Sequence, residues 1–233
     1  MFIRAVSFDR CPTALILAAA LTTGFASAAA STAAPVAAPA EVTRFVIAPG
    51  GTPIMGHGGR LMRFRVAVEQ GIPTPTPAAF AAAVVKILSD PRSWTAGGLW
   101  RFQRVGPRTH ADFTIYLVTP RTRERICEEG DDDLYTSCRI DGHVVINLDR
   151  WLYGVSNYPA PIGVYRAYLI DHETGHELGH GHVLCPGPGK PAPVMEQQTL
   201  GLHGCVPNSW PYPDGKYYTG RPGVYHDPIP KHP

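Results

Sequence analysis

Alternation of apolar and polar residues along the chain predicts several β-strands. In residues 143–148, Val144 and Ile146 fall on one side and Val145 on the other, as the two faces of a strand require. Other segments rich in β-branched and aromatic residues show a similar pattern, and glycine pairs punctuate the first two of them. The predicted strands cover residues 41–47, 61–68, 100–105, 112–118 and 143–148.

The strand at 143–148 allows two interpretations. It lies shortly before a predicted helix, so it could form the rim of a cleft and pair with an extended peptide. It could equally be an ordinary interior strand. The pattern of residues leaves both interpretations open.

Two helices are predicted from apolar spacing and from proline positions. Phe80, Val84 and Leu88 recur at helical spacing in residues 78–88, which follow prolines of the kind tolerated in a first helical turn. The second predicted helix covers residues 163–178, because two prolines stop the segment before it.

The N-terminal 40 residues have the composition of an export signal and a spacer. Arg4 and Arg10 precede an apolar run at 14–21, and Ala26-Ser27-Ala28 matches a small-x-small cleavage site. We therefore expect a secreted protein, or a cell-surface protein if the signal stays uncleaved, with no stable membrane span after cleavage. The expected division is a signal peptide at 1–28, an Ala/Pro-rich spacer at 29–40 and a single domain at 41–233.

Composition narrows the possible partners. The formal net charge is only +2 over 233 residues, which gives no reason to expect nucleic acid as a partner. The 24 glycines and 24 prolines predict a loop-rich domain with modest helix content. We expect the protein to be a monomer.

Four cysteines remain once the signal is removed. In an exported chain, four cysteines indicate two disulfides with three possible connectivities, and local pairs that each close a short loop are favoured. In the competing interpretation, Cys185 joins His180 or His182 in a second zinc site. The expected pairs are Cys127–Cys138 and Cys185–Cys205.

An acidic run at residues 128–133 lies inside the loop that the first pair would close. Clustered carboxylates can bind Ca²⁺, but the spacing matches no EF-hand loop. A solvated acidic loop is the favoured interpretation, and a calcium site has no further support.

The strongest chemical signal is the segment 172–182, which reads HETGHELGHGH. His172 and His176 are four residues apart, so on a helix they lie on one face and can hold one metal ion. Glu173 lies between them, where its carboxylate can take a proton from water. Gly179 allows the helix to end, because glycine adopts positive φ without a steric penalty. His182 then becomes the third ligand, and a catalytic zinc keeps its fourth position open.

A second HExxH overlaps the first and defines an alternative register. In that register His176 and His180 bind the metal, Glu177 is the base and the third ligand is unidentified. If the helix continued through His180, that residue would lie about 12 Å from His172 along the axis. The compact set that contains His182 is therefore favoured.

The complete pattern, HExxHxxGxxH followed by Met195 in a tight turn, resembles that of the metzincin metallopeptidases. More narrowly, residues 170–205 are similar to a family of exported bacterial domains of unknown function. The resemblance implies an α+β, zincin-like fold: a mixed twisted sheet and two main helices above a zinc cleft, with an irregular C-terminal lower half. Met195 would form an apolar floor beneath the histidines.

The implied activity is that of a secreted zinc metallopeptidase. One Zn²⁺ ion, with Glu173 as general base, would hydrolyse a peptide or protein substrate bound in extended conformation. Some metzincins place a tyrosine just after the methionine turn, but here residues 196–198 read EQQ. Tyr212, Tyr217 and Tyr218 are distant candidates for that role.

Two other functions are compatible with the same motif. A surface binding module could use zinc only to hold its fold, although such a site has no use for Glu173. A zinc amidase acting on cell-wall cross-links would carry the same motif. The motif does not separate peptide bonds from cell-wall amides.

Overall fold

The structure is a computed structural model that describes residues 44–127 and 133–231. The expected signal peptide and spacer lie outside the described residues, as do residues 41–43 of the first predicted strand. Within the described ranges, no helix combines the length and apolar character needed to cross a bilayer.

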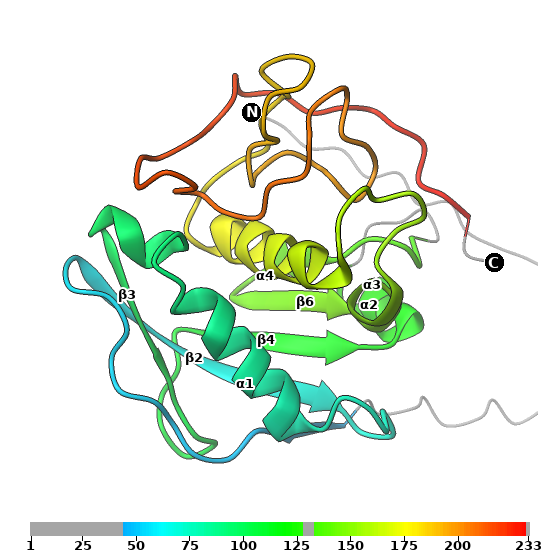
Figure 1. The fold of residues 1–233 in the computed structure, drawn as a ribbon. Helices are drawn as coiled ribbons and strands as arrows, with labels where there is room; N and C mark the ends of the chain where they lie inside the picture. The colour runs from blue at the N-terminus through cyan, green and yellow to red at the C-terminus, as the bar shows by residue number, and fades with distance from the viewer. Residues whose placement is uncertain (1–43, 128–132, 232–233) are drawn as a thin grey trace, which may run out of the picture. The chain divides into compact units, whose positions relative to one another are not determined.

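A mixed, twisted, open sheet forms the base of this α+β fold (Figure 1). The strand order is β1-β2-β4-β6-β5, and β3 pairs with β2 beside this path. The central strands β2, β4 and β6 run parallel to one another, whereas β1 and β5 are antiparallel to their neighbours. The strands are β1 (Phe45–Ile47), β2 (Arg60–Glu69), β3 (Trp100–Arg104), β4 (Phe113–Val118), β5 (Cys138–Ile140) and β6 (His143–Asn147).

The strand predicted at 143–148 is an interior strand, so the interpretation of it as a free rim is wrong. Val144 of β6 is opposite Ile115 of β4 on one side and Arg139 of β5 on the other. Its backbone groups are therefore already paired in the sheet. The short strand β5, which the sequence pattern did not predict, forms this edge of the sheet instead.

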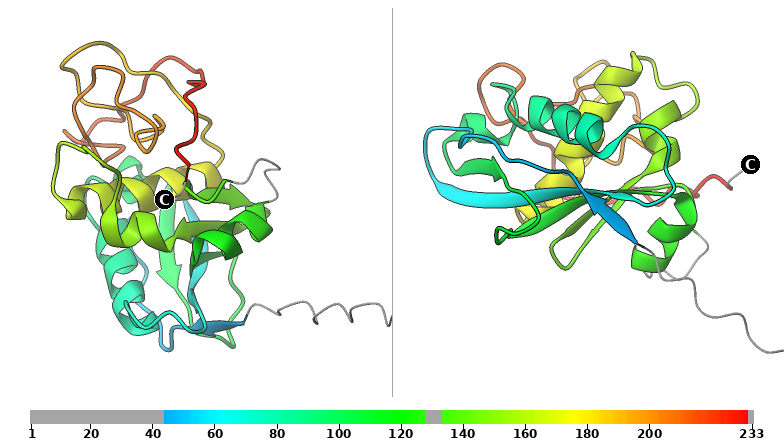
Figure 2. Two further views of the ribbon diagram at one scale, coloured as in Figure 1. Left: turned by 90° about the vertical axis from the view of Figure 1, so that its right-hand side faces the viewer. Right: turned by 90° about the horizontal axis from the view of Figure 1, so that it is seen from below.

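The two longest helices, α1 (Pro77–Leu88) and α4 (Ile162–Glu177), pack on the same face of the sheet (Figures 1 and 2). The hydroxyl of Thr76 caps α1 by accepting from the Ala79 amide at 3.2 Å. The helical repeat of Phe80, Val84 and Leu88 is fully buried against the sheet, as its spacing predicts. The alternation in β6 places Val144 and Ile146 in this same core.

The opposite face carries α2 (Pro120–Cys127) (Figure 2). A smaller hydrophobic core lies on this side. Val145 of β6 points to this side and packs with Val118 and the Cys127–Cys138 disulfide. The helix α3 (Leu148–Tyr153) follows β6 directly, and the short 3-10 helix η1 (Trp94–Gly97) precedes β3. None of α2, α3 and η1 was predicted.

No helix or strand follows α4 in the described chain, which continues to Lys231. This irregular segment lies over the side of α4 that faces away from the sheet (Figure 1). Buried amides satisfy its backbone: Gln198 Nε2 donates to the Asn208 carbonyl at 2.8 Å, and Asn208 Nδ2 donates to the Ala192 carbonyl at 3.0 Å. The Cys185–Cys205 disulfide holds the same region.

Candidate metal centre

Three histidine side chains meet at the end of α4. His172 and His176 lie one turn apart on the helix, and His182 returns to them from the segment that follows it. The Nε2 atom of His176 lies 3.1 Å from that of His172 and 3.1 Å from that of His182. Each residue thus offers one ligand atom, and the three atoms lie within 4.8 Å of one another.

A Schellman-type end of α4 brings His182 back to the other two. Gly179 has φ +92°, where a side chain would be strained. The amide of Gly179 donates to the His176 carbonyl at 3.1 Å, and the amide of His180 donates to the Gly175 carbonyl at 2.9 Å. These two hydrogen bonds satisfy the last helical carbonyls and turn the chain sharply.

Backbone carbonyls fix the tautomers of the two helical histidines. Nδ1 of His172 donates to the carbonyl of Val194 at 2.7 Å, and Nδ1 of His176 donates to the carbonyl of His180 at 2.8 Å. A carbonyl oxygen only accepts, so the proton sits on Nδ1 and each Nε2 keeps a lone pair. A carbonyl behind each ring is the usual support of a metal-binding histidine.

The environment favours the neutral form of His172 and of His182. Burial, together with the neighbouring imidazoles of His176 and His182, lowers the pKa of His172 well below its usual value. Burial also lowers the pKa of His182 to about 4. Neutral imidazole is the form that binds metal, so the donors are ready at neutral pH.

This donor set fits a zinc ion. The lone pairs on Nε2 of His172 and His176 face each other at 3.1 Å, an arrangement that a cation between them would make favourable. In a tetrahedral site with Zn–N bonds of about 2.05 Å, neighbouring nitrogens lie about 3.3 Å apart. Within the described part of the chain, no fourth protein ligand joins the three histidines, and three protein ligands are the composition of an open, catalytic zinc site.

The alternative register does not come together in the described structure. His180 instead stacks on the Trp94 ring with 4.5 Å between centroids, and its Nδ1 lies 3.2 Å from the hydroxyl of Tyr217. Glu177 pairs with Arg139 of β5 at 2.7 Å. Both residues of that register therefore have other contacts.

Glu173 lies between the first two histidines on the helix and is 5% exposed. It lines the same cavity, of about 420 Å³, as the three imidazoles. The wall across from α4 includes β5 and the residues before it, and loop residues 197–200 and Ile229 of the C-terminal segment complete the lining.

Met195 packs against Gly175 of α4, in a turn closed by the Glu196 amide donating to the Pro193 carbonyl at 2.9 Å. It is 2% exposed. A methyl group at Gly175 would overlap its sulfur and would lie 2.7 Å from Cζ2 of Trp94. Glycine at 175 therefore allows both side chains to pack closely against the turn of α4 that carries the histidines.

Ser93 and Trp94, at the start of the 3-10 helix η1, also hold α4 in place. Trp94 Nε1 donates to the carbonyl of Asp171 at 2.8 Å, and Ser93 Oγ donates to Oδ1 of Asp171 at 2.7 Å. Asp171 is fully buried, and burial raises its pKa well above the usual range. Asp171, which precedes His172, is thus held through both its backbone carbonyl and its side chain.

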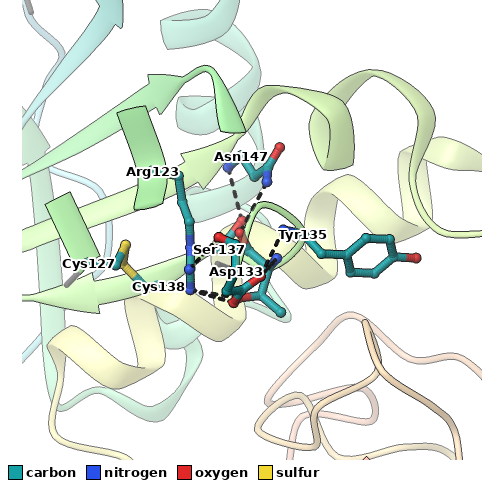
Figure 3. Close-up of a disulfide and its surroundings, with 8 residues drawn as sticks. Arg123, Cys127, Asp133, Tyr135, Ser137, Cys138 and Asn147 are labelled. Atoms are coloured by element: carbon teal, nitrogen blue, oxygen red, sulfur yellow. Dashed lines mark hydrogen bonds and ion pairs between the residues drawn. A yellow bond between two sulfur atoms is a disulfide. The ribbon is translucent and has the colours of Figure 1, made fainter. Parts of the chain in front are cut away.

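The expected solvated acidic loop is wrong for its last residue. Asp133 is 2% exposed and pairs with the equally buried Arg123 at 2.9 Å (Figure 3). Its carboxylate also accepts from the amides of Tyr135 and Thr136 at 2.8 and 2.9 Å. Together with the Cys127–Cys138 disulfide, this cluster holds the 133–138 wall of the cavity. Residues 128–132, the rest of the acidic run, lie outside the described residues.

The second zinc site suggested for Cys185 is also wrong, because Cys185 is bonded to Cys205 with an S–S distance of 2.10 Å. Glu196 approaches this disulfide, but the bonded sulfurs of Cys185 and Cys205 provide no metal-binding thiolate. Instead, Oε1 of Glu196 lies 3.3 Å from Nδ1 of His203, and Nε2 of His203 lies 2.9 Å from Oδ2 of Asp227.

Sequence reasoning missed one tyrosine of the cavity. Tyr168 lines it, and its hydroxyl donates to the Glu196 carbonyl at 3.2 Å. Its position four residues before His172, on the same helix face, was the available signal. Tyr212, Tyr217 and Tyr218 are not among the residues that line this cavity.

Comparison with known proteins places the chain in a family. The family described as "Protein of unknown function (DUF3152)" matches residues 32–213, which include the three histidines, Glu173 and both disulfides. Among curated proteins and solved structures, none matches the chain. The match covers well over half of the sequence, and the chain therefore belongs to the DUF3152 family.

Proposed function

We propose that this protein is an exported zinc-dependent peptidase of metzincin type. The observation that carries the proposal is the convergence of the three Nε2 atoms beside the buried carboxylate of Glu173, in one open cavity. A purely structural zinc site would close its coordination with protein ligands and would not need that carboxylate.

The proposed chemistry divides between the metal and the chain. His172, His176 and His182 would hold the ion. When bound, zinc supplies Lewis acidity: it lowers the pKa of a coordinated water toward ~7 and stabilises negative charge on a carbonyl oxygen. Glu173 accepts the proton of the attacking water and later delivers it to the leaving nitrogen.

The proposed substrate is a peptide in extended conformation. Cys138 and Arg139 of β5 line the cavity, and β5 pairs only with β6 among the described strands. An extended peptide can add to such an edge through its backbone groups. The Arg139–Glu177 ion pair ties this edge to the end of α4 and thus sets the width of the proposed groove.

The test is metal analysis of the purified protein combined with cleavage of a peptide library. We expect about one zinc per chain and cleavage that a chelator abolishes and added zinc restores. Zinc-loaded protein that retains its fold but leaves every peptide intact would refute the peptidase. Cleavage of cell-wall cross-links by that same protein would identify an amidase in its place.

A further inference from the structure

A second cavity, of about 520 Å³, adjoins the cavity lined by the three histidines and Glu173, which is called the metal cavity below. Thr199 and Leu200 line both cavities, so the loop after Met195 forms their common wall. The other walls come from α3 and the residues after it, from Tyr135, and from Pro230 and Lys231 near the C-terminus. A substrate chain that leaves the metal site past Thr199 would enter this space.

The unusual residue of the second cavity is Arg150. It is only 7% exposed, and its Nε is buried without a hydrogen-bond partner. Within residues 44–127 and 133–231, its guanidinium forms neither an ion pair nor a hydrogen bond. The guanidinium lies over the ring of Tyr135, whose centroid is 3.8 Å from Cζ.

Burying a cation without a nearby anion destabilises the folded state, and buried arginines are normally paired with an anion. The contrast with Arg123 is informative, because that equally buried guanidinium has the carboxylate of Asp133 at 2.9 Å. No acidic residue compensates Arg150 in the second cavity: among the described residues, its lining contains two cations, Arg150 and Lys231, and no aspartate or glutamate. The site therefore has the charge and the donors to receive an anion from outside the chain.

We propose that Arg150 is a specificity-determining residue that binds a substrate carboxylate in a subsite continuous with the metal cavity. A guanidinium suits this role because its planar donors match the two oxygens of a carboxylate. The carboxylate belongs either to an Asp or Glu side chain of the substrate or to its free C-terminus. The role in substrate choice rests on the proposed peptidase function, whereas the binding of the carboxylate can be measured without hydrolysis.

The binding test uses the zinc-loaded Glu173→Ala variant, so that peptides are not consumed. Fluorescent alanine-based peptides carry Glu or Gln at each position in turn, with a free or an amidated C-terminus. A charge-assisted hydrogen bond of this kind corresponds to roughly a 10- to 100-fold preference. We expect a preference of this size either for Glu over Gln at one position or for the free C-terminus over the amidated one. The peptide series that shows the preference identifies which carboxylate binds.

Second substitutions assign the preference to Arg150. In the Glu173→Ala background, Arg150→Met should reduce the ratio of the affinities for acidic and neutral peptides to near one. Arg150→Lys in its place should retain part of that ratio. The matched control is Lys86→Met, which removes the same charge from an exposed position that lines neither cavity. This control should leave the ratio unchanged.

Thermal unfolding separates binding from a structural role. Removing a buried, unpaired charge in favour of a residue of similar shape should leave Tm unchanged or raise it. An Arg150→Met variant that loses Tm while the affinity ratio stays the same would overturn the proposal, as would equal affinity for all acidic and neutral peptides. An Arg150-dependent ratio in a protein that cleaves no peptide would support the carboxylate site and refute the peptidase instead.

Discussion

Nδ1 of His172 donates a hydrogen bond of 2.7 Å to the carbonyl of Val194, and Val194 immediately precedes Met195. The turn that contains Val194 and Met195 thus determines which nitrogen of His172 faces the cavity. The candidate centre is therefore built jointly by α4 and by the irregular C-terminal segment, and neither part suffices alone.

Gly175→Ala tests the packing between these two parts. Alanine favours a helix by about 1 kcal/mol over glycine, but its methyl group would overlap Met195 and crowd Trp94. Overpacking of this kind typically costs about 1–3 kcal/mol, so after the helix gain we expect a net loss of up to about 2 kcal/mol in unfolding free energy. Denaturant unfolding measures it. A more stable variant with unchanged zinc affinity would show that the contact is not tight.

His182→Ala and His180→Ala form a matched pair that tests the register of the motif. His182→Ala removes a proposed zinc ligand and should weaken zinc binding by more than about 100-fold. That is more than the roughly 10- to 100-fold loss typical when a residue that only hydrogen-bonds to a ligand is removed. His180 packs on Trp94, and only its backbone carbonyl contacts His176, so its side chain should affect zinc by less than about tenfold. Competition with a chromophoric chelator measures both affinities. The reverse order would make the chosen register wrong.

Much of the fold could be predicted because its main elements carry a strong periodic pattern. The helix α1 and the strand β6 place their apolar residues at spacings of four and two, and these residues form the core. The missed elements lack that signal: α2 reads PRTRERIC, and β5 has only three residues. A usable cue preceded β6, where Asp141 and Gly142 both have positive φ, as a two-residue hairpin turn requires.

The local part of the site could be predicted from spacing along one helix. Residues 172, 173 and 176 are fixed relative to one another by helix geometry, and Gly179 marks where the chain turns. The contacts that support them come from distant segments, as with Ser93 on Asp171 and Val194 on His172. Arg150 could not be recognised from the sequence, because only tertiary structure reveals that a cation is buried without a partner.

Asp133→Ala tests the buried ion pair in the wall of the metal cavity. The substitution removes the carboxylate that pairs with Arg123 and accepts from two backbone amides. Removing one member of a buried pair costs about 3 kcal/mol or more, so unfolding should occur at clearly lower denaturant concentration. Adding Arg123→Met should recover part of the loss. Without any such recovery, the charge of Arg123 would not be the source of the cost.

Glu196→Gln tests a predicted dependence of stability on pH. Burial raises the pKa of Glu196 from 4.5 to about 7, against the opposing effect of His203. The folded state therefore holds this proton to higher pH than the unfolded chain, so the stabilisation is present below about pH 4.5 and is lost as pH rises to about 7. In zinc-free protein, Tm should fall less over this range for Glu196→Gln than for wild type. Parallel curves would contradict the raised pKa.

The most direct test of the central claim compares wild-type protein and Glu173→Ala in zinc content and in the rate of peptide cleavage. The proposed division of roles predicts equal zinc in both, because Glu173 is not a ligand. It also predicts a cleavage rate reduced by roughly 10²- to 10⁴-fold in the variant, because the general base is lost. Cleavage by Glu173→Ala at the wild-type rate, with its zinc still bound, would contradict the account.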